Sequence, residues 1–485
     1  MSVKHKAVSS TLWTMARIFL DQVFSFLVFV VVARILGPAD VGIFALGMIV
    51  VEFGRIFSTS GFGDSVTKAS ADEEEEVARA AFWGNMALAV LCAILIALAA
   101  VPVAQLMQSP RLAPVIIALA GTVPISAGYA IHQARQLKRF GHKSLAIRSL
   151  VAGVIGGAVA IASAYAGAGV WSLVIQRSVT EVIAFVTIWL SFRWVPGFRF
   201  SGDRLRSILS FSTQMSASKL GNLVVTRFQD MVIGAYVSPS GVGVYRVAKR
   251  TIDMMMTGAL TSFSTVSLSL FAAVREDEAK LRAAVIRIIA VSATVAFPIF
   301  AGMAVVAPDL IPLIYGPKWD ASVVLLQLLT PLAVPALFSL LCMSILTIYS
   351  QAAAVSYLTL AQLVLTVLLS LISAPYGIEA VILAYLARLY LIMPFQIWLV
   401  ARHAGCKASV LVGAMARPLF ASLVMAFCCY AALQQLLWIA PHPVMRLLCV
   451  SLLGAMVYAG LLWIVDRQSL RWLIELARGY AKRRA

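Results

Sequence analysis

The sequence predicts an all-α protein that crosses a membrane many times, and three observations lead to this prediction. Hydrophobic residues make up 61% of the 485-residue chain, whereas soluble domains contain about 45–50%. Charged residues make up 12%, about half of the usual share of ~25%. The mean hydropathy is +0.93, and a soluble fold could not cover so much apolar surface. This composition excludes soluble enzymes, disordered tails and collagen-like chains.

Apolar segments long enough to cross a bilayer as a helix, about 20 residues each, recur along the chain. The connections between them are short, and several contain turn signals such as Gly37-Pro38. We expect fourteen transmembrane helices, at residues 11–36, 41–66, 80–106, 112–136, 145–166, 168–192, 208–236, 240–270, 282–306, 321–349, 354–374, 377–401, 409–437 and 443–466.

The distribution of basic residues predicts the orientation of these helices. With the N-terminus in the cytosol, cytosolic segments hold about 25 Lys and Arg, because positive charge resists translocation. The opposite side holds only Arg34, Arg111, Lys318 and Arg446. An even number of helices places the C-terminus in the cytosol as well. The net charge of +18 follows from this asymmetry, so nucleic acid is not expected as a partner.

An internal repeat predicts the domain organisation. Residues 37–44 read GPADVGIF and residues 238–245 read SPSGVGVY, at an offset of 201. Six expected helices separate the copies, so both copies have the same orientation, as in transporters with parallel repeats. We expect an N-lobe at 1–200, a C-lobe at 201–402, two further helices at 403–466 and a basic amphipathic cytosolic tail at 467–485.

Ionisable residues within the expected helices are candidates for a transport site, because a charge facing lipid costs about 2.5–3.5 kcal/mol. The helix at 240–270 carries Arg246, Lys249, Arg250 and Asp253, whose spacing places them on one face. Lys249 lies ~13 Å along this helix, near the middle of the bilayer. Three cations against one carboxylate predict an anionic ligand such as a diphosphate, which arginine binds through two oxygens. Alternatively, acids on neighbouring helices neutralise these cations.

Further bases and acids lie in three other expected helices. They are the bases Arg17, Arg55, Lys219 and Arg227 and the acids Asp21, Glu52 and Asp230. We assign the bases to the same cationic cavity, and these acids together with Asp253 to charge balance or to coupling with a proton or Na⁺. Each acid also has a base three or four residues away, so ion pairs within single helices are an equal alternative. Arg177 and Glu181 are interpreted as a structural pair.

Two other features have structural interpretations. The acidic run Asp72–Glu76 fits a capping box, in which Asp72 and Glu75 begin the helix at 80–106. Trp171 and Trp319 lie near the expected outer face, where we interpret them as interfacial anchors rather than sugar-stacking platforms.

Signatures of enzymes and metal sites do not occur in the sequence. The patterns GxxxxGK[ST], HExxH and GxSxG are missing, and the five histidines are scattered. The six cysteines lack metal-ligand spacing. We therefore expect neither an enzyme nor a cofactor or metal.

Two segments resemble a known family. Residues 33–68, ARILGPADVGIFALGMIVVEFGRIFSTSGFGDSVTK, resemble the helix 1–2 signature of the polysaccharide and O-unit flippases (Wzx-like) of the MOP superfamily. Residues 307–319, APDLIPLIYGPKW, resemble the helix 9–10 turn of that family. The resemblance covers essentially the whole chain and points to the exopolysaccharide branch. It implies export of polyprenyl-diphosphate-linked oligosaccharides across the bacterial inner membrane for lipopolysaccharide or exopolysaccharide biosynthesis. It further implies membrane lipids, a polysaccharide polymerase and export machinery as partners.

Two other functions remain open. A MATE-like multidrug antiporter of the same superfamily would export organic cations, which a net-basic interior disfavours. A membrane polysaccharide polymerase or ligase would resemble chains with a large outer loop bearing arginines, whereas the loops expected here are short.

Overall fold

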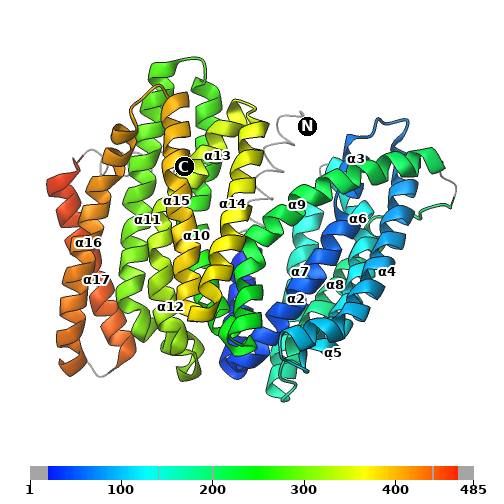
Figure 1. Ribbon diagram of the computed structural model, residues 1–485, viewed down its shortest axis with the longest axis horizontal. Coiled ribbons are helices and arrows are strands. Elements are labelled where there is room, and N and C mark those ends of the chain that lie inside the picture. The colour runs from blue at the N-terminus through cyan, green and yellow to red at the C-terminus, as the bar shows by residue number, and fades with distance from the viewer. Residues whose placement is uncertain (1–19, 140, 199–200, 440–441, 468–485) are drawn as a thin grey trace. The chain divides into compact units, whose positions relative to one another are not determined.

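The computed structural model describes residues 20–139, 141–198, 201–439 and 442–467, and all regular structure within them is helical (Figure 1). The chain divides into two compact units, Met1–Arg246 and Val247–Ala485. The boundary between these units falls within helix α10. The expected lobe boundary at residue 200 stays a prediction.

The first unit begins with a helical segment at residues 20–35. It continues with α2 (Pro38–Thr59), α3 (Phe62–Lys68), α4 (Glu74–Leu106), α5 (Leu112–Ala120), α6 (Thr122–Lys138), α7 (His142–Tyr165), α8 (Trp171–Ser191), α9 (Gly202–Tyr236) and the first turns of α10 (Pro239–Val274). Proline at the first position of α2 explains where this helix begins, because a proline there leaves no additional N–H unsatisfied.

The second unit contains the rest of α10 and the helices α11 (Glu278–Tyr315), η1 (Pro317–Trp319), α12 (Ala321–Leu329), η2 (Thr330–Leu332), α13 (Ala333–Ile348), α14 (Ala352–Ser373), η3 (Ala374–Tyr376), α15 (Ile378–His403), α16 (Ala408–Ile439) and α17 (Pro443–Val465). Asp277 caps α11 by accepting a hydrogen bond of 3.0 Å from the Lys280 N–H. This bond lowers the pKa of the Asp277 carboxyl.

The lengths and hydropathy of the helices confirm a multi-span membrane protein. Eleven segments in the described part of the chain are long and apolar enough to cross a bilayer. Residues 20–35 are what the structure describes of the helix expected at 11–36. Helices α9 and α10 are longer than a bilayer needs, but they are not among the eleven, and both carry several charged side chains. The number fourteen therefore stays a prediction.

The predicted capping box at the start of α4 is wrong. The helix begins at Glu74, and its N-cap residue is Glu73, whose side chain makes no capping hydrogen bond. The acids bind bases on α6 instead: Glu74 lies 3.1 Å from Arg135 and 3.0 Å from Lys138. The acidic run therefore pairs with basic side chains of α6 rather than with the free backbone N–H groups at the start of α4.

The turn expected at residues 307–319 is shorter than predicted. Helix α11 continues through Pro308 and Pro312 to Tyr315, and only the residues from Gly316, at φ 95°, leave it. Trp319 is fully buried rather than anchored at an interface, whereas Trp171 is 42% exposed. The motif therefore supports the packing of the second unit.

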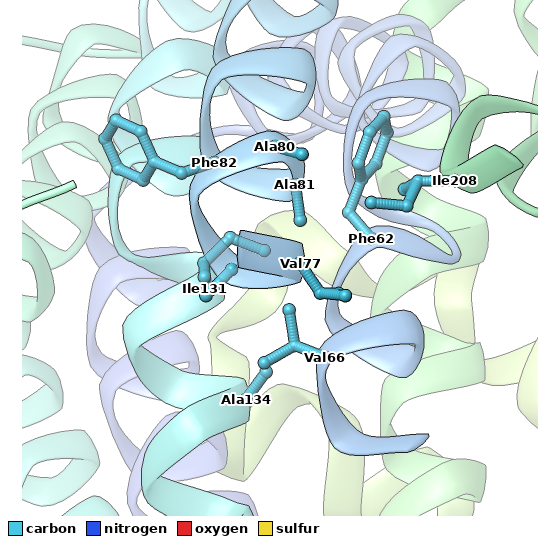
Figure 2. Close-up of a cluster of buried hydrophobic side chains, with 10 residues drawn as sticks. Phe62, Val66, Val77, Ala80, Ala81, Phe82, Ile131, Ala134 and Ile208 are labelled. Carbon is cyan, nitrogen blue, oxygen red and sulfur yellow. The ribbon is translucent and has the colours of Figure 1, made fainter. Parts of the chain in front are cut away.

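A cluster of buried apolar side chains joins α3, α4, α6 and α9 within the first unit (Figure 2). Its members are Phe62, Val66, Val77, Ala78, Ala80, Ala81, Phe82, Ile131, Ala134 and Ile208. The small alanine face of α4 allows the neighbouring helices to approach closely, as is usual between helices in membranes.

The two copies of the sequence repeat contact each other within the first unit. A Cβ atom on Gly42 would overlap the backbone carbonyl oxygen of Pro239, and one on Gly243 would overlap that of Pro38. The contact is reciprocal, because each glycine lies against the proline of the other copy. Glycine is required at both positions since only a hydrogen atom fits between the two backbones.

Candidate functional site

The predicted site residues lie on four helical segments. Asp21 is in the segment 20–35, Glu52 and Arg55 are on α2, Lys219, Arg227 and Asp230 are on α9, and Arg246, Lys249, Arg250 and Asp253 are on α10. Arg17 lies outside the described residues. Residues up to Arg246 belong to the first unit, and the last three on α10 belong to the second.

Two of the predicted cations in the first unit pair with acids on neighbouring helices. The Nε atom of Arg227 lies 3.2 Å from a carboxylate oxygen of Glu52. Arg246 lies 3.0 Å from the buried carboxylate of Asp230. In both contacts an acid on a neighbouring helix neutralises the cation, which is the alternative that the sequence left open. An anionic ligand would therefore compete with these carboxylates.

Arg55 pairs with Glu181 on α8 rather than with Glu52 on its own helix. Its Nη1 atom donates a hydrogen bond of 2.9 Å to Glu181, whose side chain is 4% exposed. Arg177, one turn earlier on α8, pairs with the same carboxylate oxygen. Tyr129 on α6 donates a hydrogen bond of 2.7 Å to the other oxygen. Glu181 is therefore a shared centre for three helices, and Arg55 and Tyr129 join the structural pair of Arg177 and Glu181.

Two further residues on α7 extend this cluster. The Arg148 guanidinium lies 5.9 Å from the centre of the Tyr129 ring. Ser149 donates a hydrogen bond of 2.8 Å to Asp21. The buried Nε atom of Arg177 makes no hydrogen bond to any described residue. Arg55 and Arg177 thus share the single carboxylate of Glu181, and Arg148 lies beside the tyrosine that binds its other oxygen.

In the second unit, the predicted face of α10 carries an ion pair within the helix. Lys249 pairs with Asp253, one turn later. Thr251, next to Arg250 in the sequence, shares a hydrogen bond of 3.0 Å with the Tyr315 hydroxyl of α11. This contact is an ion pair within a single helix, which is the other alternative that the sequence left open. Asp253 is therefore neutralised by a cation of its own helix.

Lys219 makes a long and exposed ion pair. It lies 4.0 Å from Asp64, and both side chains are 51% exposed. An exposed pair at this distance contributes about 0–1 kcal/mol. The lysine can therefore change partner at little cost.

Sequence reasoning missed a polar stripe on α9. Exposed amide, hydroxyl and ammonium side chains recur nearly every turn along this membrane-length helix, at Gln214, Ser218, Lys219, Asn222 and Thr226. A row of polar groups facing lipid would be costly, so this face is suited to a water-filled path. The regular spacing of these residues is the signal in the sequence, and four of the five carry no charge.

The donor set fits an anion better than a metal. No group of three metal-ligating side chains occurs among the residues that the structure describes. Guanidinium groups bind phosphate and carboxylate through paired N–H donors. The guanidinium groups of Arg55 and Arg177 can bind an anion if it takes the place of the Glu181 carboxylate as their partner.

Comparisons with known proteins identify the fold and the family. The chain is 24% identical over 466 residues to the succinoglycan biosynthesis transport protein ExoT of Rhizobium meliloti, covering 94% of this chain and 92% of that protein. The lipid II flippase MurJ, in an inward closed conformation, has a TM-score of 0.76 at 13% identity, over 95% of this chain and all of that one. An inward-facing multidrug resistance MATE family transporter of the MOP superfamily has a TM-score of 0.61 at 16% identity, over 80% of this chain and 98% of that one.

These proteins are named as transporters and a flippase, and none of the three names describes an enzyme. The fold therefore agrees with the resemblance found in the sequence. Residues 31–324 match the family described as "Polysaccharide biosynthesis protein". This chain thus belongs to the polysaccharide biosynthesis protein family and has the fold of the MOP-superfamily transporters.

Proposed function

We propose that this protein is a flippase that moves polyprenyl-diphosphate-linked oligosaccharide units across the bacterial inner membrane for polysaccharide export. Both chain ends are in the cytosol, and two lobes rock around a cationic cavity that opens to one side at a time. The polyprenyl chain remains in lipid during the movement. Released units pass to a polysaccharide polymerase and the export machinery.

The sharing of the buried Glu181 carboxylate by two guanidinium groups is the observation that carries this proposal. Arg55 and Arg177 share one buried carboxylate, and Arg148 lies beside the tyrosine that binds its other oxygen. A diphosphate diester carries roughly one negative charge on each phosphate. Such a group can replace the carboxylate as partner of two guanidiniums and can also use the buried Nε–H of Arg177.

The existing ion pairs give the site a moderate affinity for the diphosphate. Arg227 and Arg246 already have carboxylate partners in the first unit. Substrate must displace these partners, so part of the binding free energy is lost in breaking the pairs. A transported ligand requires this balance, because a site that binds too tightly does not release.

The polar stripe on α9 supports an oligosaccharide as the rest of the substrate. Gln214 and Asn222 offer amide groups that both donate and accept hydrogen bonds. Ser218 and Thr226 add hydroxyl groups between them. Neutral donors and acceptors in a row suit sugar hydroxyls, whereas a lipid tail would leave them unsatisfied.

A different observation disfavours each of the two rival functions. A multidrug antiporter shares the fold, but the two guanidiniums that share Glu181 would repel an organic cation. The ExoT relative, which matches nearly the whole chain, is named a transport protein rather than a polymerase.

Deletion of the gene tests the proposal directly. Lipid-linked repeat units should still form, should accumulate facing the cytosol, and should not reach the outside as polymer. Single units that appear outside without being polymerised would favour the polymerase. Resistance to cationic drugs that falls while polymer export is normal would favour the antiporter.

Substitution of Arg250 tests the diphosphate site on α10. Arg250→Ala should abolish export and Arg250→Lys should restore it only in part, because a guanidinium grips two phosphate oxygens and an ammonium does not. Each variant is compared at equal abundance in the membrane. If Arg250→Ala combined with Asp253→Asn regains export, the arginine serves the aspartate and this part of the site is wrong.

A further inference from the structure

A recess with a basic lining lies at one end of three helices of the second unit. Its volume is about 520 Å³. Arg282 of α11, Arg402 of α15 and Lys407, just before α16, supply its cations, and Gly405, Cys406 and Val410 are among its other lining residues. All three cations are exposed. None of them belongs to the proposed transport site.

The recess lies at the level of the membrane surface. The candidate spans Glu278–Tyr315, Ile378–His403 and Ala408–Leu436 begin or end beside it. The Arg402 guanidinium lies 5.4 Å from the ring centre of Trp398, which is itself half exposed and stacked on Phe395. Tryptophan is enriched at the lipid headgroup level. The positive-inside distribution predicts that this end faces the cytosol.

The electrostatics of the recess favour an anion. A Cβ atom on Gly405 would lie 3.6 Å from both Arg282 and Glu278, so one carboxylate lies beside this part of the recess. The charge of the set is still positive after this carboxylate is counted. Helix α16 begins beside the recess and adds the positive end of its dipole. The turn that leads into α16 uses Gly405 at φ 60°, a backbone conformation that favours glycine.

Exposed apolar side chains continue from the recess along the same helices. Val410 and Val412 are exposed on α16. Leu391 and Phe395 are exposed on α15, on the membrane side of Trp398. A ligand with a charged head and acyl chains would use both parts of this surface, whereas a free anion would use only the basic part.

We propose that this recess binds the phosphate headgroup of an anionic phospholipid, such as phosphatidylglycerol, from the surrounding leaflet. Basic pockets between transmembrane helices on the cytosolic side bind such headgroups by charge attraction. The site is separate from the transport site and does not depend on what the protein transports.

Binding of phosphatidylglycerol to the purified full chain, measured by native mass spectrometry, tests this proposal. Arg402→Gln combined with Lys407→Gln should weaken binding about 30-fold, since each basic side chain near the leaflet contributes roughly a fivefold factor. The matched control is Lys280→Gln combined with Arg467→Gln. Arg467 stacks on Trp463 at 5.5 Å much as Arg402 stacks on Trp398, but neither control residue lines the recess.

The control variant should bind phosphatidylglycerol as the unchanged protein does, and phosphatidylethanolamine binding should not differ among the three proteins. Equal loss in both double variants would overturn the proposal, because it would reflect net charge alone. Effective competition by inorganic phosphate would identify a general anion site and would also overturn it. A selective loss of undecaprenyl diphosphate binding would assign the recess to the transported lipid instead. None of these outcomes depends on transport, so a failure here leaves the flippase proposal untouched.

Discussion

Glu181 accepts a hydrogen bond from Tyr129 and pairs with Arg55 and Arg177, so three helices of the first unit depend on one carboxylate. Removing one member of a buried ion pair costs about 3–5 kcal/mol, because the remaining charge loses its partner. Both arginine side chains are partly exposed. Water therefore compensates for some of the loss at this site.

Glu181→Gln should lower the stability of the protein by about 2–3 kcal/mol, measured as a lower Tm of the purified protein. Combining it with Arg177→Gln should recover part of the loss, because one unpaired cation is removed together with the carboxylate. Glu379→Gln on α15 is the control, since Glu379 is exposed and a surface change is usually within ~0.5 kcal/mol. An unchanged Tm in Glu181→Gln would show that the carboxylate does not hold the arginines.

The sequence reveals which residues are charged but not which of them meet. The spacing of Glu52 and Arg55 allows a pair within α2, yet Glu52 binds Arg227 of α9 and Arg55 binds Glu181 of α8. Helices of similar length can be rotated about their axes without any change in their sequence pattern. Spacing alone predicts the pairs of Lys249 with Asp253 and of Arg177 with Glu181, because both members of each pair lie on one helix.

At the level of elements, the repeat explains why two glycines recur at an offset of 201. The sequence showed Gly42 and Gly243 as matching positions, but it could not show that each lies against the other copy's proline. Helix positions, by contrast, were predictable, because apolar runs of bilayer length can form little else than helices in lipid. The ends of the helices were less predictable. The helix expected at 80–106 begins at Glu74, and the helix expected at 282–306 continues to Tyr315.

Gly243→Ala should strongly destabilise the protein, because the new methyl group overlaps the Pro38 carbonyl and two backbones must separate. Gly258→Ala on the same helix meets no atom within 4 Å. It should be neutral or stabilise by about 0.5–1 kcal/mol, as alanine favours helix. Abundance in the membrane and Tm distinguish the two variants. Equal behaviour would mean that the close contact between the repeat copies does not exist.

For the whole molecule, α9 and α10 differ from the other long helices in their polarity. Both helices carry polar and charged side chains, and neither is among the eleven segments of the described chain that are apolar enough to cross a bilayer. Lengths of 35 and 36 residues, or ~52–54 Å at ~1.5 Å per residue, are more than a bilayer core requires. Helices that line a water-filled cavity are expected to have this combination of length and polarity.

Labelling of single cysteines with a membrane-impermeant maleimide tests this topology. The background lacks the six natural cysteines, and the test positions Ser201, Val237 and Glu276 lie before α9, between α9 and α10, and after α10. If both helices cross, Val237→Cys should react in intact cells, whereas Ser201→Cys and Glu276→Cys should react only after the membrane is opened. Ser70→Cys and Pro110→Cys, at the two ends of α4, calibrate the inner and outer sides. Protection of Val237→Cys in intact cells would leave α9 and α10 on one side. The charged face of α10 would then lie at the membrane surface, and the cationic cavity could not open to both sides.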